Sequence, residues 1–279
     1  MVSSVFRVGS DLIRTLVQRQ FDHQPVSDRY VLGPPRAIVQ FWDDLRQLPK
    51  DVEECIASWA RWEAHGFTHR LFDEHSARDF IVRSLGARHQ LAFERCYHPA
   101  MQADYFRLCY LWVEGGLYVD ADDVCVSADI ACLFDDGRLK VQPLCYDSET
   151  DKNLDPSMFL RADAHSSSWT FYFANSPLIA APGNPIIESA LVRATDLLEA
   201  IGDDEFPEIQ TTTGPGNISK AIFDCHLKSG GVENDMMVLR EWGSFSKSRW
   251  SLSYRKDHRN WRRSNRQKFN RNATQFDPG

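Results

Sequence analysis

Residues 99–123, PAMQADYFRLCYLWVEGGLYVDADD, are the stretch of sequence from which the fold is predicted most directly. Pro99 opens a mostly apolar segment that closes at Gly115–Gly116, as expected of a helix with proline in its first turn and glycine after its last. Leu117–Val119 follow as a short apolar strand, and the acidic group Asp120–Asp123 comes directly after it. A helix that leads into a buried strand is typical of an α/β domain.

Strands and helices alternate on both sides of this stretch. Ala37–Trp42 is a short apolar run after two prolines and predicts a buried first strand. The spacing of apolar residues from Asp51 to His65 predicts a helix, and Thr68–Phe72 a second strand. Further helices are predicted at 5–21, 73–84, 87–96, 184–200 and 217–229, strands near 124–126, 139–145 and 171–181, and loops at 22–35 and 211–216. This alternation predicts one α/β domain.

Composition limits the class of protein. The 279 residues weigh 32.0 kDa, with 43% hydrophobic and 25% charged side chains, which excludes a disordered or fibrous chain. No stretch approaches the ~20 apolar residues of a membrane-spanning helix, and residues 5–21 lack the uninterrupted apolar core of a secretory signal. The seven cysteines include no C-x-x-C pair, so reduced, mostly buried thiols in a cytoplasmic protein are expected.

The charge is distributed unevenly along the chain. Residues 1–246 carry 22 Lys and Arg against 37 Asp and Glu, or −15, whereas residues 247–279 carry 10 against 2, or +8. Such a basic tail suggests nucleic acid or a membrane surface as a partner. Because the acidic body would repel a phosphate backbone, no nucleic-acid partner is expected. A peripheral contact with the inner face of the membrane stays open.

The acids after the strand predict a metal site. Alternate residues of an extended segment point to the same side, so Asp120 and Asp122 face one ligand together, while Asp123 is expected to be a solvated neighbour. Like charges this close repel unless a cation compensates them, and Mg²⁺ or Mn²⁺ suits carboxylates combined with substrate phosphates. On the preceding helix, Asp104 and Arg107 share a face within an apolar stretch. They are expected to be a buried pair belonging to the site, the alternative being an ordinary surface ion pair.

These residues carry a resemblance to a known family. Ala103-Asp104-Tyr105-Phe106-Arg107 followed by Gly115-Gly116-Leu117-Tyr118-Val119-Asp120-Ala121-Asp122 resembles the signature of family 32-type glycosyltransferases, whose sugar-binding region contains a DXD motif. Other segments that resemble the family are Ala37–Trp42, His69–Asp73, Thr213–Pro215 and His258–Trp261. The last departs from the family pattern, because Asn260 stands where serine is usual and only two residues separate His258 from Trp261.

The resemblance implies a GT-A fold, with a Rossmann-like central sheet and flanking helices, over residues 36–262. Residues 1–35 would be an N-terminal helix and loop, and residues 263–279 a basic tail. The implied activity is metal-dependent transfer of a sugar, with retention of anomeric configuration, from a UDP- or GDP-sugar to a hydroxyl of a carbohydrate or another acceptor. Such an enzyme serves glycan, polysaccharide or glycoconjugate biosynthesis, and its cofactor is Mn²⁺ or Mg²⁺.

The resemblance also assigns site residues. The catalytic group would be Asp104, Arg107, Asp120 and Asp122. Further donor contacts would come from Trp42 stacking on the base, from Tyr118, and from Thr213, Gly214 and Trp261. The metal would be held by Asp120 and Asp122, with His258 or Asn260 completing its shell. Basic residues at the start of the tail, namely Arg255, Lys256, Arg262 and Arg263, would form a lid over the diphosphate.

Two other functions fit parts of the sequence. Residues 119–124 also match D-x-D-x-[VT], the first motif of haloacid-dehalogenase-like phosphatases, in which Asp120 would be the nucleophile. That hypothesis needs Lys140 and Asp203–Asp204 as partners and leaves Asp104 and Arg107 without a role. The second alternative is a non-catalytic relative that binds sugar nucleotides or glycans.

Overall fold

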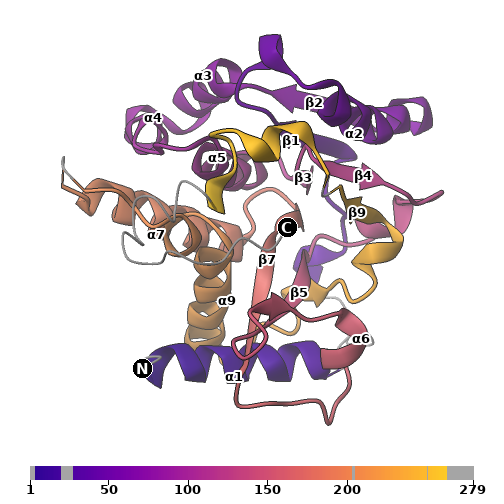
Figure 1. Ribbon diagram of the computed structural model, residues 1–279, viewed down its shortest axis with the longest axis vertical. Helices are drawn as coiled ribbons and strands as arrows, with labels where there is room; N and C mark the ends of the chain where they lie inside the picture. The colour runs from indigo at the N-terminus through magenta and orange to yellow at the C-terminus, as the bar shows by residue number, and fades with distance from the viewer. Residues whose placement is uncertain (1–3, 20–27, 203–204, 250, 263–279) are drawn as a thin grey trace.

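The computed structural model of the protein describes residues 4–19, 28–202, 205–249 and 251–262. In this part of the chain a seven-stranded mixed sheet is flanked by helices (Figure 1). The predicted α/β class, with its Rossmann-like central sheet, is therefore confirmed.

The sheet contains β1 (Ala37–Phe41), β2 (Thr68–Phe72), β3 (Gly116–Tyr118), β5 (Leu139–Asp147), β6 (Lys152–Asn153), β7 (Trp169–Ala180) and β8 (Met236–Val238). A separate antiparallel pair is formed by β4 (Asp123–Cys125) and β9 (Ser246–Ser248). The helices are α1 (Ser4–Gln18), α2 (Lys50–Ala60), α3 (Glu74–Leu85), α4 (Ala87–Glu94), α5 (Pro99–Val113), α6 (Pro156–Phe159), α7 (Pro185–Ala200), α8 (Ile209–Thr212) and α9 (Pro215–Ser229).

The strand order places the ends of three strands together. The sheet runs β2-β1-β3-β7-β5-β6, with β8 beside β5, and β1 is parallel to both β2 and β3. The carboxyl ends of these parallel strands therefore meet at one edge of the sheet, where ligands bind in open α/β sheets. Trp42, Asp73 and Asp120 follow β1, β2 and β3, so the order of strands alone brings these positions to one edge.

One predicted loop is wrong. Residues 211–216 instead finish α8 and begin α9. The Glu208 carboxylate accepts hydrogen bonds from the backbone N–H groups of Gln210 and Thr211, at 3.1 and 2.8 Å, and so caps α8. Pro215 then starts α9, in the position where a helix tolerates proline. A side-chain cap and an N-terminal proline thus convert a turn-like sequence into two helix ends.

The N-terminal helix α1 lies at the opposite end of the molecule from α2 and β2 (Figure 1). Ile13, Leu16 and Val17 are buried in the main hydrophobic core, and α1 contacts β7 and α9. The Arg240 guanidinium donates hydrogen bonds to the carbonyls of Val17 and Arg19, both at 2.6 Å. An arginine at a helix C-terminus satisfies carbonyls that have no partner within the helix. Within the residues described, no helix has the length and apolar character to span a membrane.

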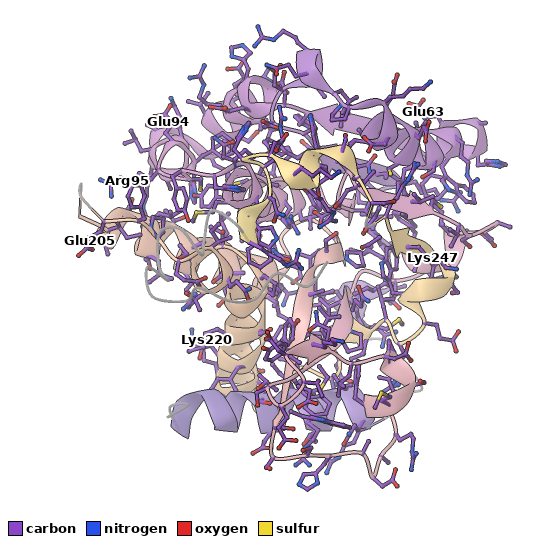
Figure 2. The ribbon with its side chains drawn as sticks, in the orientation of Figure 1. Glu63, Glu94, Arg95, Glu205, Lys220 and Lys247 are labelled. Carbon is purple, nitrogen blue, oxygen red and sulfur yellow. The ribbon has the colours of Figure 1, made fainter. Side chains whose placement is uncertain are left out.

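A second arginine, Arg95, links two helices, α4 and α7. Arg95 follows α4 and lies beside the end of α7 (Figure 2), where its Nη1 donates to the carbonyls of Leu198 and Glu199 at 2.8 and 2.9 Å. The last turn of α7 is thus capped by a residue about 100 positions earlier in the chain. Because α4 leads into α5, this contact helps to fix the helix that carries Asp104 and Arg107.

Substituting Gly116 tests the entry into β3. Gly116 has a φ of +115°, and a Cβ there would lie 2.7 Å from the Ala37 carbonyl oxygen. We expect Gly116→Ala to lower the free energy of unfolding by about 2 kcal/mol or more, measured by urea denaturation. Gly9→Ala is the matched control, since a Cβ at Gly9 in α1 would meet nothing within 4 Å, and alanine favours a helix interior. Equal stability of the two variants would contradict the strain assigned to Gly116.

Candidate active site

The site is built around the side chain of Arg107 on α5. Its Nη2 lies 2.8 Å from Asp104 Oδ1, one turn earlier on the helix, and 3.0 Å from Asp120 Oδ1, just after β3. The Arg107 side chain is 3% exposed and that of Asp104 10%, so the pair is buried, as the sequence predicted, and is not a surface ion pair. The three charges join α5 to the carboxyl end of the sheet.

Arg107 also contacts β3 and β7. Its Nη1 donates to the Asn175 carbonyl at 2.5 Å, and its guanidinium lies 4.4 Å from the centre of the Tyr118 ring. Burial opposes the charge on Arg107, but the carboxylate of Asp120 and the other groups around it raise the pKa of Arg107 overall. The guanidinium is therefore always positively charged, and groups from several elements contact it.

The structure corrects the role predicted for Tyr118. Its side chain is 1% exposed and lies under the Arg107 guanidinium, so it does not present a surface to a nucleotide. As the last residue of β3, Tyr118 points to the face of the sheet that α5 covers. Its contribution is to support Arg107.

Two residues of β7 belong to the site and were missed in the sequence. Asn175 Nδ2 donates to Asp104 Oδ1 at 2.7 Å, and the Asp120 backbone N–H donates to Ser176 Oγ at 3.0 Å. Because β7 pairs with β3, Asn175 reaches the Asp104 carboxylate and Ser176 reaches the backbone of Asp120. No local motif marks them, and only the pairing of β7 with β3 could have pointed to them.

The T-G-P segment reaches the same carboxylate. Thr213 is 2% exposed, and its hydroxyl lies 3.4 Å from Asp104 Oδ2. Gly214 follows as the N-cap of α9. Thr213 and Gly214 were both predicted to contact the donor. Thr213 contacts Asp104, and Gly214 begins the helix that follows.

The Asp104 carboxyl has a strongly shifted pKa. Burial is the main cause and raises the pKa from 3.8 to about 6, with Arg107 opposing and Asp120 adding to the rise. The carboxylate is nevertheless held by hydrogen bonds from Asn175 and Thr213. A buried carboxyl so shifted beside a charged partner is typical of functional sites.

Asp122 lies on the other side of the acidic turn. Its Oδ2 accepts hydrogen bonds from the Tyr254 hydroxyl and from Arg255 Nη2, both at 2.6 Å. Burial and the nearby charge of Asp120 raise the pKa of Asp122. Asp120 and Asp122 therefore repel each other, as their spacing predicted, and Asp122 is compensated by residues far along the chain.

Asp123 is not the solvated neighbour that was expected. It is 6% exposed, begins β4 and accepts a hydrogen bond from the Ser248 hydroxyl on β9 at 2.5 Å. Its carbonyl accepts from Trp59 Nε1 at 3.0 Å. Burial, with Asp122 and Asp120 adding to it, raises its pKa well above the usual value. The pairing of β4 with β9 covers this side chain, and that pairing is not visible in the local sequence.

The partners of Asp122 and Asp123 belong to one segment, residues 246–262 without 250, which we call the C-terminal strap. In Figure 1 the strap is the orange-to-yellow segment that runs from β9 toward α5. Ser253 bonds the Asp51 carboxylate through both its N–H and its hydroxyl, and Arg259 Nε lies 3.0 Å from Asp43 Oδ1. His98 Nε2 is 3.0 Å from the His258 carbonyl. The start of the basic tail is therefore packed against the site.

Trp42 joins the strap to the end of β1. The edge of its ring meets Tyr254 at 5.2 Å between centroids and 85°, and the Arg259 guanidinium lies 5.6 Å from it. Trp42 is 7% exposed, and its Nε1 is buried and has no hydrogen-bond partner among the described residues. Such an orphaned donor is rare in a folded protein and calls for an explanation.

The remaining predicted residues of the strap are spread around it. Asn260 Nδ2 donates to the Arg255 carbonyl at 2.8 Å, and its Oδ1 accepts from the Arg262 N–H at 3.2 Å, so this amide holds the strap itself. His258 and Lys256 are exposed, and Trp261 packs against the main core with the Arg262 guanidinium 4.8 Å away. Arg263 and Asp203–Asp204 lie outside the described residues.

The carboxylates of the acidic turn are the candidate ligands for a divalent cation. Among the described residues no three His, Cys, Asp or Glu side chains gather as a ready metal cage, and Asn260 is engaged within the strap. However, Asp104, Asp120, Asp122 and Asp123 bring four carboxyl groups together, and the ion pairs described above place Arg107 and Arg255 against them. Magnesium is commonly held by one or two carboxylates together with substrate phosphates. Asp120 and Asp122 fit that mode of binding.

Comparison with known proteins agrees with this geometry. Residues 49–131 match the family described as "Glycosyltransferase sugar-binding region containing DXD motif", which spans α2, α5 and the acidic turn. The resemblance to family 32-type glycosyltransferases is thereby confirmed over these residues, which make up less than half of the chain.

Individual relatives are more distant. The chain is 22% identical over 190 residues to the initiation-specific alpha-1,6-mannosyltransferase of Schizosaccharomyces pombe, an alignment covering 63% of this chain and 45% of that protein. The chain thus spans less than half the length of this relative. A solved structure titled PaToxG Glycosyltransferase covers 95% of this chain and 94% of its own, with 13% identity and a TM-score of 0.40.

The phosphatase alternative lacks the lysine that it requires beside Asp120. Lys140, which that hypothesis needs beside Asp120, is 1% exposed on β5, and its ammonium lies 3.1 Å from Asp136 Oδ1. Asp120 is instead paired with Arg107. An arginine that neutralises the supposed nucleophile disfavours attack by it.

The pH dependence of stability tests the burial of Asp104. Because its pKa is about 6 in the folded protein against 3.8 in the unfolded chain, the folded state binds the proton more tightly. Wild-type stability should therefore fall, relative to Asp104→Asn, by about 2–3 kcal/mol as the pH rises from about 4 to about 6. Urea denaturation at several pH values measures this difference.

Asp155→Asn is the control with opposite sign. Asp155 caps α6, and the hydrogen bond from Ser157 lowers its pKa. Relative to this variant, wild-type stability should rise with pH through the acidic range. If Asp104→Asn shows the same trend as Asp155→Asn, Asp104 is not desolvated as described.

Proposed function

We propose that this chain is a metal-dependent, retaining glycosyltransferase. It would move a sugar from a UDP- or GDP-sugar to a hydroxyl of a carbohydrate or another acceptor. The observation that carries the proposal is the ion pair of the buried residues Asp104 and Arg107, joined to Asp120 at the carboxyl end of β3. These residues lie inside the matched sugar-binding region.

Asp104 and Arg107 would bind the donor sugar. Hydroxyl groups need both donors and acceptors at fixed positions, and a buried carboxylate beside a guanidinium provides both. Asn175 and Thr213 hold Asp104 at 2.7 and 3.4 Å, so its remaining acceptor directions are set before the sugar arrives. Such preorganisation reduces the cost of orienting a substrate.

Trp42 would bind the nucleobase. It follows β1 at the ligand-binding edge of the sheet and is fixed by Tyr254 and Arg259. Its buried, unpartnered Nε1 supports a ligand or water as the missing acceptor on this side of the site. Aromatic side chains bind bases by stacking, whatever the base is, which is consistent with either UDP or GDP.

Asp120 and Asp122 would hold Mn²⁺ or Mg²⁺ together with the donor diphosphate. When bound, such a cation stabilises the negative charge that develops on the leaving diphosphate. Asp120 is oriented by Arg107 through its carboxylate and by Ser176 through its N–H. The chain thus positions this ligand from two elements.

The transfer itself would proceed on one face of the sugar. The bond from the anomeric carbon to the diphosphate oxygen breaks, the acceptor oxygen bonds to the same carbon from the same side, and the acceptor proton passes to the leaving diphosphate. Asp104 and Asp120 are both engaged with Arg107, which favours this front-face route over a covalent intermediate on either carboxylate.

Removing the carboxylate of Asp104 or of Asp122 should strongly lower the rate of sugar transfer. We expect Asp104→Asn and Asp122→Asn each to lower the rate by about 100-fold or more, because each removes an oriented charge from the reacting region. The measurement is release of UDP or GDP from a panel of sugar nucleotides, with Mn²⁺, with Mg²⁺ and with chelator.

Asp163→Asn is the control, since that carboxylate is 74% exposed and paired only with a surface arginine. Its rate should equal that of the wild type. Full activity in Asp122→Asn, or activity unaffected by chelator, would refute the metal-dependent transfer. If the wild type binds a sugar nucleotide and still transfers nothing to water or any acceptor, the non-catalytic alternative is favoured.

The stereochemistry tests the front-face route separately. We expect the anomeric configuration of the donor to be kept in the first-formed product, as read from the anomeric proton coupling by NMR. An inverted product would rule out retention while leaving the donor and metal assignments intact.

A further inference from the structure

The C-terminal strap is fixed on both sides of Arg255 by contacts that do not involve Asp122. Before it, the Ser253 N–H and hydroxyl bond the Asp51 carboxylate at 2.6 and 3.0 Å. After it, Asn260 Nδ2 donates to the Arg255 carbonyl at 2.8 Å, and Arg259 pairs with Asp43. The backbone at Arg255 would therefore stay in place if its side chain left Asp122.

The Arg255 side chain occupies the carboxylate that the proposed cation needs. Its Nη2 and the Tyr254 hydroxyl both lie 2.6 Å from the same oxygen, Asp122 Oδ2. The side chains of Arg255 and Asp122 are 18% and 16% exposed, so the pair is largely shielded from water. A divalent cation and a guanidinium placed on one carboxylate oxygen repel each other strongly in such surroundings, so a cation that takes Asp122 Oδ2 must displace the guanidinium from it.

A displaced Arg255 has a second guanidinium beside it. Desolvation first, and the positive charge of Arg255 second, lower the pKa of Arg262, and Asp122 acts in the opposite direction. The Asn260 amide also joins the backbones of these two arginines, since its Nδ2 donates to the Arg255 carbonyl at 2.8 Å and its Oδ1 accepts from the Arg262 N–H at 3.2 Å. A dianion bound between the two guanidinium groups would relieve the repulsion of their positive charges, and the planar guanidinium fork matches phosphate oxygens.

We infer that Arg255 and the divalent cation are alternative partners of Asp122, and that cation binding transfers the Arg255 guanidinium from Asp122 to the diphosphate of the donor. In this exchange Arg255 has two roles. Without the cation it neutralises Asp122 and holds the site together, and with the cation it becomes a donor-binding residue. This inference rests on the proposed function. It adds an order of binding, because the cation must bind Asp122 before Arg255 can bind the nucleotide.

The test is to measure cation and nucleotide binding separately in Arg255→Gln. Lys247→Gln is the matched control, because Lys247 is an exposed cation of the same strap, on β9 (Figure 2), and its loss changes the net charge equally. Mn²⁺ binding to the full chain without nucleotide is followed by loss of the free-ion electron paramagnetic resonance signal. Binding of UDP and of GDP at saturating Mn²⁺ is followed by calorimetry.

Arg255→Gln should bind Mn²⁺ tenfold or more tightly than Lys247→Gln, because the cation no longer competes with the guanidinium. The same variant should bind the preferred nucleoside diphosphate tenfold or more weakly. Tyr254→Phe should share the first effect in smaller degree and lack the second, since a phenol competes for Asp122 but carries no charge for the diphosphate.

The outcomes separate this inference from the proposed function. Equal Mn²⁺ affinity in Arg255→Gln and Lys247→Gln, or unchanged nucleotide affinity in Arg255→Gln, overturns the exchange and leaves the metal-dependent transferase standing. Absence of Mn²⁺ binding in the wild type and in every variant overturns both the exchange and the metal dependence.

Discussion

The buried guanidinium of Arg107 is the constraint on which the rest of the site depends. A charge this far from water is tolerated only when paired and hydrogen-bonded on most sides, and here its partners come from different elements. Asp104 lies on α5, Asp120 follows β3, and the Asn175 carbonyl belongs to β7. Loss of any one of them would leave charge uncompensated in the interior. The mutual positions of the helix, the strand end and β7 are therefore set together.

A second constraint arises because the site contains more carboxylates than Arg107 can neutralise. Asp122 and Asp123 come directly after Asp120, and burial raises the pKa of both. The strap compensates them: Tyr254 and Arg255 bond Asp122, and Ser248 bonds Asp123. The basic charge that the sequence concentrates after residue 246 thus has a local purpose where the structure describes it. It stabilises an acidic edge that would otherwise repel itself.

The sequence was most informative where the chemistry is local. Asp104 and Arg107 are one helical turn apart, so spacing alone predicts their common face. The extended segment predicted to align Asp120 and Asp122 is instead a turn, in which the Asp123 N–H donates to the Asp120 carbonyl at 3.1 Å. Asn175, Ser176 and Arg255 meet these acidic residues only through contacts between distant segments. The separation is 68 residues from Arg107 to Asn175 and 133 residues from Asp122 to Arg255. Asp123 was predicted wrongly for the same reason, because its burial depends on β9, 125 residues further on. Tyr118 was placed on the wrong side, since a strand residue next to a turn can face either the ligand or the helix layer.

The two halves of the site differ in how firmly they are held, and this difference bears on how a donor would be bound. On the Asp104 side, Asp104 and Arg107 are buried and are tied to β7 and to the end of β3, so the directions offered to a sugar change little on binding. On the Asp122 side the partners are side chains of the strap that retain some exposure. Between the halves, His98 caps α5 by accepting from the Ala100 N–H at 3.0 Å and reaches the His258 carbonyl at 3.0 Å. The strap and the first turn of the helix that carries Asp104 and Arg107 are therefore in direct contact. The rigid half suits recognition of the sugar, and the exchangeable half suits a diphosphate and cation that must enter and leave in each cycle.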